Sequence, residues 1–139
     1  DIIIGSHPHV ISPVAFYKAN NAKLDSGFVA YSMGNFLSNQ YWRYTDAGVV
    51  LTLHLTKNFT KDSIFISSVD YLPTWVYRGT NSLKKAHIIF PAQWSLRDSI
   101  APYIDGDLKK KMKEAFEDTQ LMISKDCFKI SLSDTSLDK

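Results

Sequence analysis

Cysteine is almost absent from this 139-residue sequence, and several other features that mark whole classes of proteins are missing too. The single cysteine, Cys127, cannot form an internal disulfide and excludes a cysteine-based zinc cluster. No apolar run approaches the roughly 20 residues that a membrane-spanning helix needs. The sequence also has no Gly-x-Ser-x-Gly nucleophile elbow, no P-loop and no Gly-x-Gly-x-x-Gly turn. These absences exclude the best-known hydrolase, nucleotide-binding and dinucleotide-binding signatures.

A strong excess of charge is lacking as well. The 16 Lys and Arg residues stand against 14 Asp and Glu, which leaves a net charge of +2. Proteins that bind nucleic acid through its phosphates are usually more basic, so we expect no nucleic-acid partner. What is present is the balance of a globular chain, with 45% hydrophobic and 22% charged residues, and its length suits one domain or part of one.

The hydrophobic pattern predicts a mixed α/β chain, more exactly described as α+β. Strands are expected at residues 2–5, 28–32, 48–57 and 63–72, and helices near 96–103 and 107–123. The third and fourth strands alternate and are joined by a short polar turn, which predicts an antiparallel hairpin. The apolar run at residues 2–5 is typical of a buried strand, and it stands so early that we expect the chain to be cut from a longer protein.

Two histidines follow the first predicted strand, in the sequence G-S-H-P-H from Gly5 to His9. Crevices at the carboxyl ends of strands hold ligands in α/β sheets, and neutral imidazole is a common ligand for transition metals. The pattern therefore favours His7 and His9 as metal ligands, although a pair of histidines that only hydrogen-bond a loop would have the same sequence. A hydrolytic two-metal centre also needs carboxylates, and the nearest acids show no obvious ligand spacing to this pair.

A second candidate is the turn Gly34-Asn35-Phe36, which follows the strand at 28–32. Gly permits a tight turn and Asn tolerates left-handed backbone geometry, so a purely structural turn is one interpretation. The functional interpretation places the Asn35 side chain in the same crevice as His7 and His9. Both loops follow apolar strands, so we expect them to lie side by side at one edge of a sheet.

An aromatic loop carries the third candidate, Arg43, between neighbouring rings at Tyr41, Trp42 and Tyr44. These residues would suit the binding of an anionic polymer, or they could simply pack the loop against the domain. His54 lies in the strand predicted at 48–57 and His87 opens a short apolar run, and both are expected to be structural.

Four motifs, in this order and spacing, resemble the bacterial capsule-synthesis CapA family, which includes proteins of poly-γ-glutamate synthesis. They are D-I-I-I-G-S-H-P-H-V-I-S-P-V at residues 1–14, Y-S-M-G-N-F-L-S-N-Q at 31–40, T-D-A-G-V-V-L at 45–51 and Y-L-P-T-W-V at 71–76. The resemblance covers the sequence up to Pro91. It implies that residues 1–125 are the C-terminal part of a single CapA-like domain and that residues 126–139 are a polar tail.

The resemblance also implies the fold of a calcineurin-like metallophosphoesterase, a β-sandwich flanked by helices. In those enzymes a late Gly-His-x-His motif supplies one ligand to each metal of a dinuclear site, and His7 and His9 match those two positions. A divalent metal pair (Mn, Zn or Fe) is therefore implied for the complete parent protein. The early motifs of such enzymes, Asp-x-His, Gly-Asp-x-x-Asp and Gly-Asn-His-Asp/Glu, do not occur in this sequence. We therefore expect an incomplete metal site and no activity from this chain alone.

The function implied by the resemblance is capsule or poly-γ-glutamate biosynthesis in the cell envelope, outside the cytoplasm, with membrane anchoring through a preceding part as one option. The implied partners are other capsule-synthesis proteins and an anionic polymer such as poly-γ-glutamate or a capsular polysaccharide, with Asn35 and Arg43 as substrate-binding residues. The parent would be a metal-dependent phosphoesterase-like hydrolase if it supplies the missing ligands. The alternative is a non-catalytic polymer-binding or scaffold module. We also expect self-association through a sheet edge or face that the missing half would leave exposed.

Overall fold

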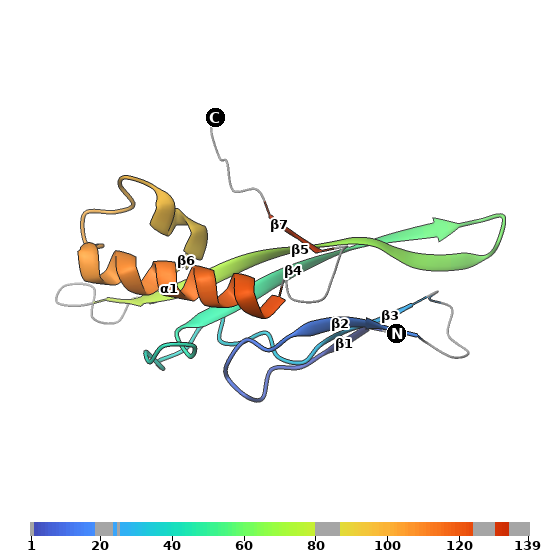
Figure 1. Cartoon of the computed structure of the whole chain (residues 1–139), viewed down its shortest axis with the longest axis horizontal. Coiled ribbons are helices and arrows are strands. Elements are labelled where there is room, and N and C mark those ends of the chain that lie inside the picture. The colour runs from blue at the N-terminus through green and yellow to red at the C-terminus, as the bar shows by residue number, and fades with distance from the viewer. Residues whose placement is uncertain (1, 19–23, 25, 80–86, 124–129, 134–139) are drawn as a thin grey trace.

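The computed structural model describes residues 2–18, 24, 26–79, 87–123 and 130–133. These residues form two β-sheets and one α-helix, so the predicted mixed α+β class is confirmed (Figure 1). The elements in chain order are β1 (Ile2–Ile4), β2 (Val14–Tyr17), β3 (Gly27–Ala30), β4 (Ala47–Asn58), β5 (Ser63–Arg78), β6 (His87–Pro91), the 3-10 helix η2 (Ala92–Leu96), α1 (Gly106–Ile123) and β7 (Ile130–Leu132).

The smaller sheet has the strand order β1-β3-β2, with β3 in the centre. β1 pairs parallel to β3 and β2 pairs antiparallel to it. The central strand is buried, with Phe28 and Ala30 fully inaccessible, but the expectation that the first strand is buried was wrong: Ile2, Ile3 and Ile4 are 38%, 54% and 53% exposed. β1 is an edge strand, and successive side chains of a strand point to opposite faces. Both faces of β1 are therefore left open by the described residues.

The larger sheet is built on the predicted hairpin of β4 and β5, which is confirmed as antiparallel. β6 and β7 both pair with β5, β6 antiparallel near its end and β7 parallel near its middle. β5 continues through Pro73 to Arg78, beyond the end predicted at residue 72. Pro73 pairs with Val49 on one side, and on the other it falls between the stretches bound by β7 and β6. Since proline lacks a backbone N–H, it fits a position of β5 that neither β6 nor β7 pairs with.

The helix α1 packs on the larger sheet, at the end away from the hairpin turn (Figure 1). The helix predicted near residues 107–123 is confirmed, and five of its residues are buried: Met112, Ala115, Phe116, Thr119 and Ile123. Asp105 caps the start of α1, because its Oδ1 accepts a 2.9 Å hydrogen bond from the Leu108 N–H. None of the helices in the described part of the chain combines the length and the apolar character needed to cross a bilayer.

The prediction of a helix near residues 96–103 was wrong. The short 3-10 helix η2 ends at Leu96, and residues 97–103 form bends and turns. Ser95 is buried and does not cap a helix, and Pro102 would break a helix that continued through the segment. Of the polar segment 126–139, residues 130–132 form β7, while 126–129 with Cys127 and 134–139 lie outside the described residues.

Candidate functional site

The loops that follow β1 and β3 lie side by side, as expected from the sequence. β1 and β3 are parallel neighbours, so their carboxyl ends meet at one edge of the smaller sheet. Backbone hydrogen bonds extend this contact into the loops: the Gly5 N–H donates to the Ala30 carbonyl at 2.8 Å, and the Met33 N–H donates to the Gly5 carbonyl at 3.0 Å. The histidine loop and the loop of Asn35 are therefore held against each other by the backbone itself.

Asn35 and His9 are in direct contact at this edge. The His9 Nδ1 lies 2.9 Å from the Asn35 Oδ1, and the Asn35 Nδ2 donates to the His9 backbone carbonyl at 3.2 Å. Asn35 is 7% exposed, whereas His9 is exposed and has a left-handed backbone, with φ of 59°. The buried amide thus holds an exposed imidazole that comes from the neighbouring loop.

Two glycines allow Asn35 to reach this position. Gly34 has φ of +67°, a conformation that residues with a Cβ rarely adopt. Gly48, at the start of β4, lies so close to Asn35 that a Cβ built on it would stand 2.7 Å from the Asn35 carbonyl oxygen. The Asn35 N–H also donates to the Ala47 carbonyl at 2.8 Å. The turn is therefore packed and hydrogen-bonded between the smaller sheet and the first residues of β4.

His7 is exposed in the same loop as His9, and only Pro8 separates the two histidines in the sequence. Within the described residues, no group of three or more His, Cys, Asp or Glu side chains converges as a metal site would. Of the nearby acids, Asp46 is buried against Trp75, and Asp1 and Asp25 lie outside the described residues. The described donor set is therefore two exposed imidazoles.

The aromatic loop forms a cluster of rings and cations on the surface. Tyr41 stacks on Trp42, with ring centroids 4.9 Å apart, and the Arg78 guanidinium lies 4.3 Å above the Tyr41 ring. The Arg43 guanidinium lies 5.1 Å from the Tyr44 ring centre. Tyr41, Trp42 and Tyr44 are all more than half exposed, so they do not pack the core. We call these five residues the aromatic cluster.

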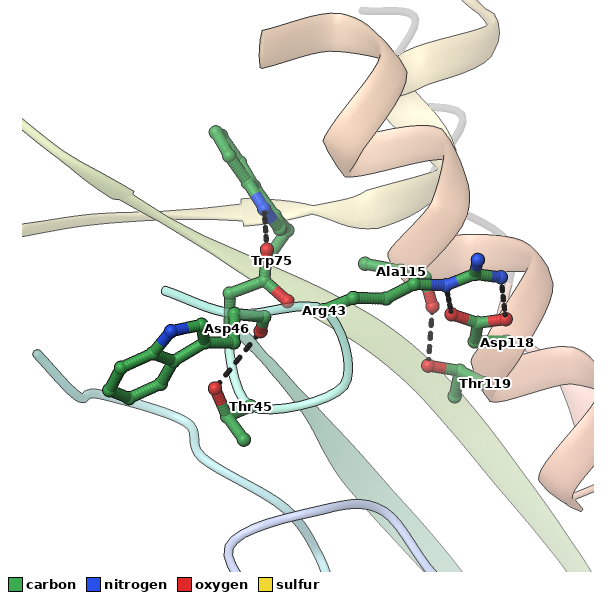
Figure 2. Close-up of polar contacts among 8 residues, drawn as sticks. Arg43, Thr45, Asp46, Trp75, Ala115, Asp118 and Thr119 are labelled. Carbon is green, nitrogen blue, oxygen red and sulfur yellow. Dashed lines mark hydrogen bonds and ion pairs between the residues drawn. The ribbon is translucent and has the colours of Figure 1, made fainter. Parts of the chain in front are cut away.

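Arg43 is already engaged by a partner on α1. Its Nε and one terminal nitrogen each donate to an Asp118 oxygen at 2.9 Å (Figure 2). The hydrogen bonds to Asp118 and then the Asp118 charge raise the pKa of the Arg43 guanidinium above its usual range. The side chain predicted to bind substrate therefore also fastens the aromatic loop to the helix.

Asp46 is the polar residue near this loop that sequence reasoning left without a role. It is 7% exposed, and its Oδ2 accepts a 2.9 Å hydrogen bond from the Trp75 indole N–H (Figure 2). Burial raises the pKa of the Asp46 carboxyl, and the hydrogen bond from Trp75 opposes that rise. Its only signal in the sequence is a lone acid directly before an apolar strand. Asp46 also lines a groove between the aromatic loop and α1, together with Tyr41, Arg43, Lys111, Glu114 and Ala115.

The remaining described histidines lie elsewhere and have structural neighbours. His54 Nε2 is 2.8 Å from Asp70 Oδ2 on the adjacent strand, and His87 Nε2 is 2.8 Å from Asn39 Oδ1. The prediction that both are structural agrees with these contacts.

Comparison with known proteins supports the family resemblance over the N-terminal part of the chain. Residues 1–40 match the family model described as Bacterial capsule synthesis protein PGA_cap. Over 60 residues, 43% of this chain, the sequence is 38% identical to the PGA biosynthesis protein CapA of Bacillus subtilis (strain 168) and to the Capsule biosynthesis protein CapA of Bacillus anthracis. The aligned segment spans only 14% and 13% of the lengths of these two relatives. No solved structure matches this chain at a significant level.

Proposed function

We propose that this chain, whose N-terminal part is similar to bacterial capsule synthesis proteins, takes part in the biosynthesis of a capsule or of poly-γ-glutamate at the cell envelope. Support comes from the four ordered motifs and from relatives whose names state this role. The family model covers the two loops that carry His7, His9 and Asn35, so the family likeness and the candidate site occupy the same residues.

We further propose that His7 and His9 are ligands of a divalent metal. The observation that carries this proposal is the pair of exposed imidazoles in one loop, one of them oriented by a buried amide from the next loop. Imidazole nitrogen suits zinc and iron, two of the metals that the family resemblance implies. Such a metal would polarise a phosphoryl oxygen or activate a water molecule.

Two imidazoles leave most of a metal's coordination positions to other groups. Full catalytic activity would need carboxylates supplied by other parts of a longer protein, together with the rest of a calcineurin-like metallophosphoesterase fold. With this chain alone we expect metal binding without hydrolysis. In this proposal His7 and His9 hold the metal and Asn35 supports His9.

A non-catalytic polymer-binding role is the second candidate, and the aromatic cluster favours it. Its three rings are exposed, and two guanidinium groups lie on their faces. Exposed rings and cations side by side offer contacts to the chain and to the carboxylates of an anionic polymer such as poly-γ-glutamate. A capsular polysaccharide or another capsule-synthesis protein would meet the same surface.

Metal binding is tested by titrating the metal-free chain with Zn²⁺ and Mn²⁺ in a calorimeter. We expect His7→Ala and His9→Ala each to abolish measurable binding, because each removes one of the two imidazoles. His54→Ala is the matched control, since it removes a histidine from β4. Equal binding by the wild type and the His7→Ala, His9→Ala double variant would overturn the proposed metal site.

The two candidate functions are separated by measuring binding to purified poly-γ-glutamate with and without EDTA. Loss of binding on chelation supports a metal-centred role. Binding that survives EDTA but is lost in Trp42→Ala supports the non-catalytic role of the aromatic cluster. No binding under either condition would contradict a direct contact between this chain and that polymer.

A further inference from the structure

We propose that Asn35 is a positioning residue that selects the protonation tautomer of His9, so that His9 presents its Nε2 lone pair to a metal. This inference rests on the proposed metal site and names the atom through which His9 would bind. It follows from the hydrogen bonds around one buried amide.

The orientation of the Asn35 amide is the first step. Its Nδ2 lies 3.2 Å from the His9 carbonyl oxygen, 2.8 Å from the Thr45 carbonyl oxygen and 2.8 Å from Gln40 Oε1. Backbone carbonyls can only accept hydrogen bonds, so the amide NH₂ must face them. The flipped amide would set an oxygen against both carbonyls and leave a buried acceptor without a donor, which is costly. The Oδ1 is therefore the atom that faces the imidazole.

The tautomer of His9 is the second step. The Asn35 Oδ1 lies 2.9 Å from His9 Nδ1, and a carbonyl-type oxygen has no hydrogen to donate. The hydrogen in this bond must therefore belong to His9 Nδ1. A neutral imidazole carries only one N–H, so the Nε2 of His9 keeps its lone pair. Free histidine favours the opposite tautomer, and the Asn35 contact reverses that preference.

Because His9 is exposed, the Nε2 lone pair of this tautomer is accessible to a metal. The side chain is exposed, and no hydrogen bond to Nε2 is found among the described residues. Metal-bound histidines usually donate their other ring N–H to an oxygen, which orients the ring and raises its basicity. Asn35 supplies that oxygen, so the ring is held for coordination before any metal arrives.

The anchoring of Asn35 explains why an amide fits this position. A carboxylate could accept from His9 Nδ1, but it could not donate to the carbonyls of His9 and Thr45. Thr45 and Gln40 belong to the segment that leads through the aromatic loop to β4, so the same amide joins that loop to the histidine loop. His7 shows no comparable support within the described residues, so we expect its ring to sample both tautomers.

The test is nitrogen NMR of the metal-free chain, with ¹⁵N-labelled histidine at about pH 8, where an ordinary imidazole is neutral. Two-bond ¹H–¹⁵N spectra distinguish a protonated Nδ1 from a protonated Nε2. We expect the Nδ1–H form for wild-type His9 and a mixture for His7. A wild-type His9 that carries its hydrogen on Nε2 would overturn the inference, without the need for any variant.

Two variants then test the role of Asn35. Asn35→Ala should return His9 to the tautomer mixture of a free histidine and weaken Zn²⁺ binding about 10- to 100-fold. Gln40→Ala is the control, because it removes one acceptor and leaves both carbonyls to orient the amide. An unchanged His9 tautomer in a folded Asn35→Ala chain would overturn the inference.

Failure of the proposed metal site is distinguishable from failure of this inference. The tautomer is read in metal-free protein, whereas metal binding is read by calorimetry. A wild-type Nδ1–H signal that is lost in Asn35→Ala supports the positioning role of Asn35 even if Zn²⁺ does not bind. That combination would count only against the metal site.

Discussion

Arg43 and Asp118 are joined by two parallel hydrogen bonds of 2.9 Å, although 75 positions separate them in the sequence. These hydrogen bonds connect the aromatic loop to α1, so the position of the aromatic cluster on the surface depends on the helix (Figure 2). A planar guanidinium meets a carboxylate in this two-pronged way with well-defined geometry. In the proposed polymer-binding role, Arg43 acts by contact, by fixing the loop, or by both.

Substitution at the two ends of this ion pair separates those contributions. We expect Arg43→Ala to weaken binding of poly-γ-glutamate more than Asp118→Asn does, because only the first removes a cation from the surface. The measurement is polymer affinity at low and at high salt, with the thermal midpoint as a check on folding. Equal loss in both variants would mean that loop anchoring, and not a contact from Arg43, carries the effect.

Asp46 gives a prediction about pH and stability. Burial raises the pKa of its carboxyl, so the native state holds the proton at a higher pH than the unfolded chain does. The folded chain therefore loses stability as pH rises from the ordinary aspartate pKa, near about 4, through the raised value. We expect Asp46→Asn, which keeps an acceptor for Trp75, to be more stable than the wild type at neutral pH and no more stable at about pH 3.

Asp46→Ala is the matched comparison for that experiment. It leaves the Trp75 indole N–H buried without its acceptor, which costs about 1–3 kcal/mol. Urea unfolding of the three proteins at both pH values measures these differences. A wild type that is more stable than Asp46→Asn at neutral pH would contradict the predicted sign.

Gly48→Ala tests the packing that places Asn35. The new Cβ would stand within 2.8 Å of three backbone atoms of Asn35 and Phe36, and the backbone must move to admit it. We expect a loss of about 1–3 kcal/mol, typical of overpacking, together with a displaced Asn35 and a changed His9 tautomer. Gly106→Ala is the control, because nothing lies within 4 Å of its added Cβ. The same response in both variants would argue against a clamp at Gly48.

Asp70 on β5 gives a prediction about its contacts with His54 on β4 and Ser131 on β7. The Ser131 hydroxyl, and then His54, hold the pKa of the Asp70 carboxyl below its usual range. Ser131→Ala and His54→Ala should each raise that pKa toward the ordinary value. Carboxyl ¹³C NMR titration measures both shifts, and an unchanged pKa in Ser131→Ala would contradict the contact between β7 and β5. The stability from these contacts is present above the ordinary pKa and is lost as pH falls through the lowered one.

The open edge at β1 predicts self-association. Ile3 and Ile4 are more than half exposed on a strand that has a partner on one side only among the described residues. We expect light scattering to show mass rising with concentration, and Ile3→Lys to reduce that rise by placing a charge at the edge. Phe59→Ser, at the exposed hairpin turn, is the control. A strictly monomeric wild type across the series would contradict the prediction.

The local elements followed from the sequence because their causes are local. Alternation of apolar residues predicted the hairpin of β4 and β5, and the hydrophobic pattern near residues 107–123 predicted α1. The positions of His9 and Asn35, each directly after a short apolar strand, were enough to expect their loops at one sheet edge. The errors arose where pairing with other strands sets the structure. Pro73 lies inside β5 at the point where the partner strand changes from β7 to β6, and β1 is exposed because it lies at an edge of its sheet.

The contacts within the candidate site were decided by tertiary structure. The sequence by itself determined the chain's resemblance to capsule-synthesis proteins and the presence of the histidine pair that we propose as metal ligands. No local pattern could show that Arg43 pairs with Asp118, that Asp46 lies against Trp75, or which nitrogen of His9 faces Asn35. Each of these contacts joins residues that are 26 to 75 positions apart, and only packing of the sheets and the helix brings them within hydrogen-bonding distance.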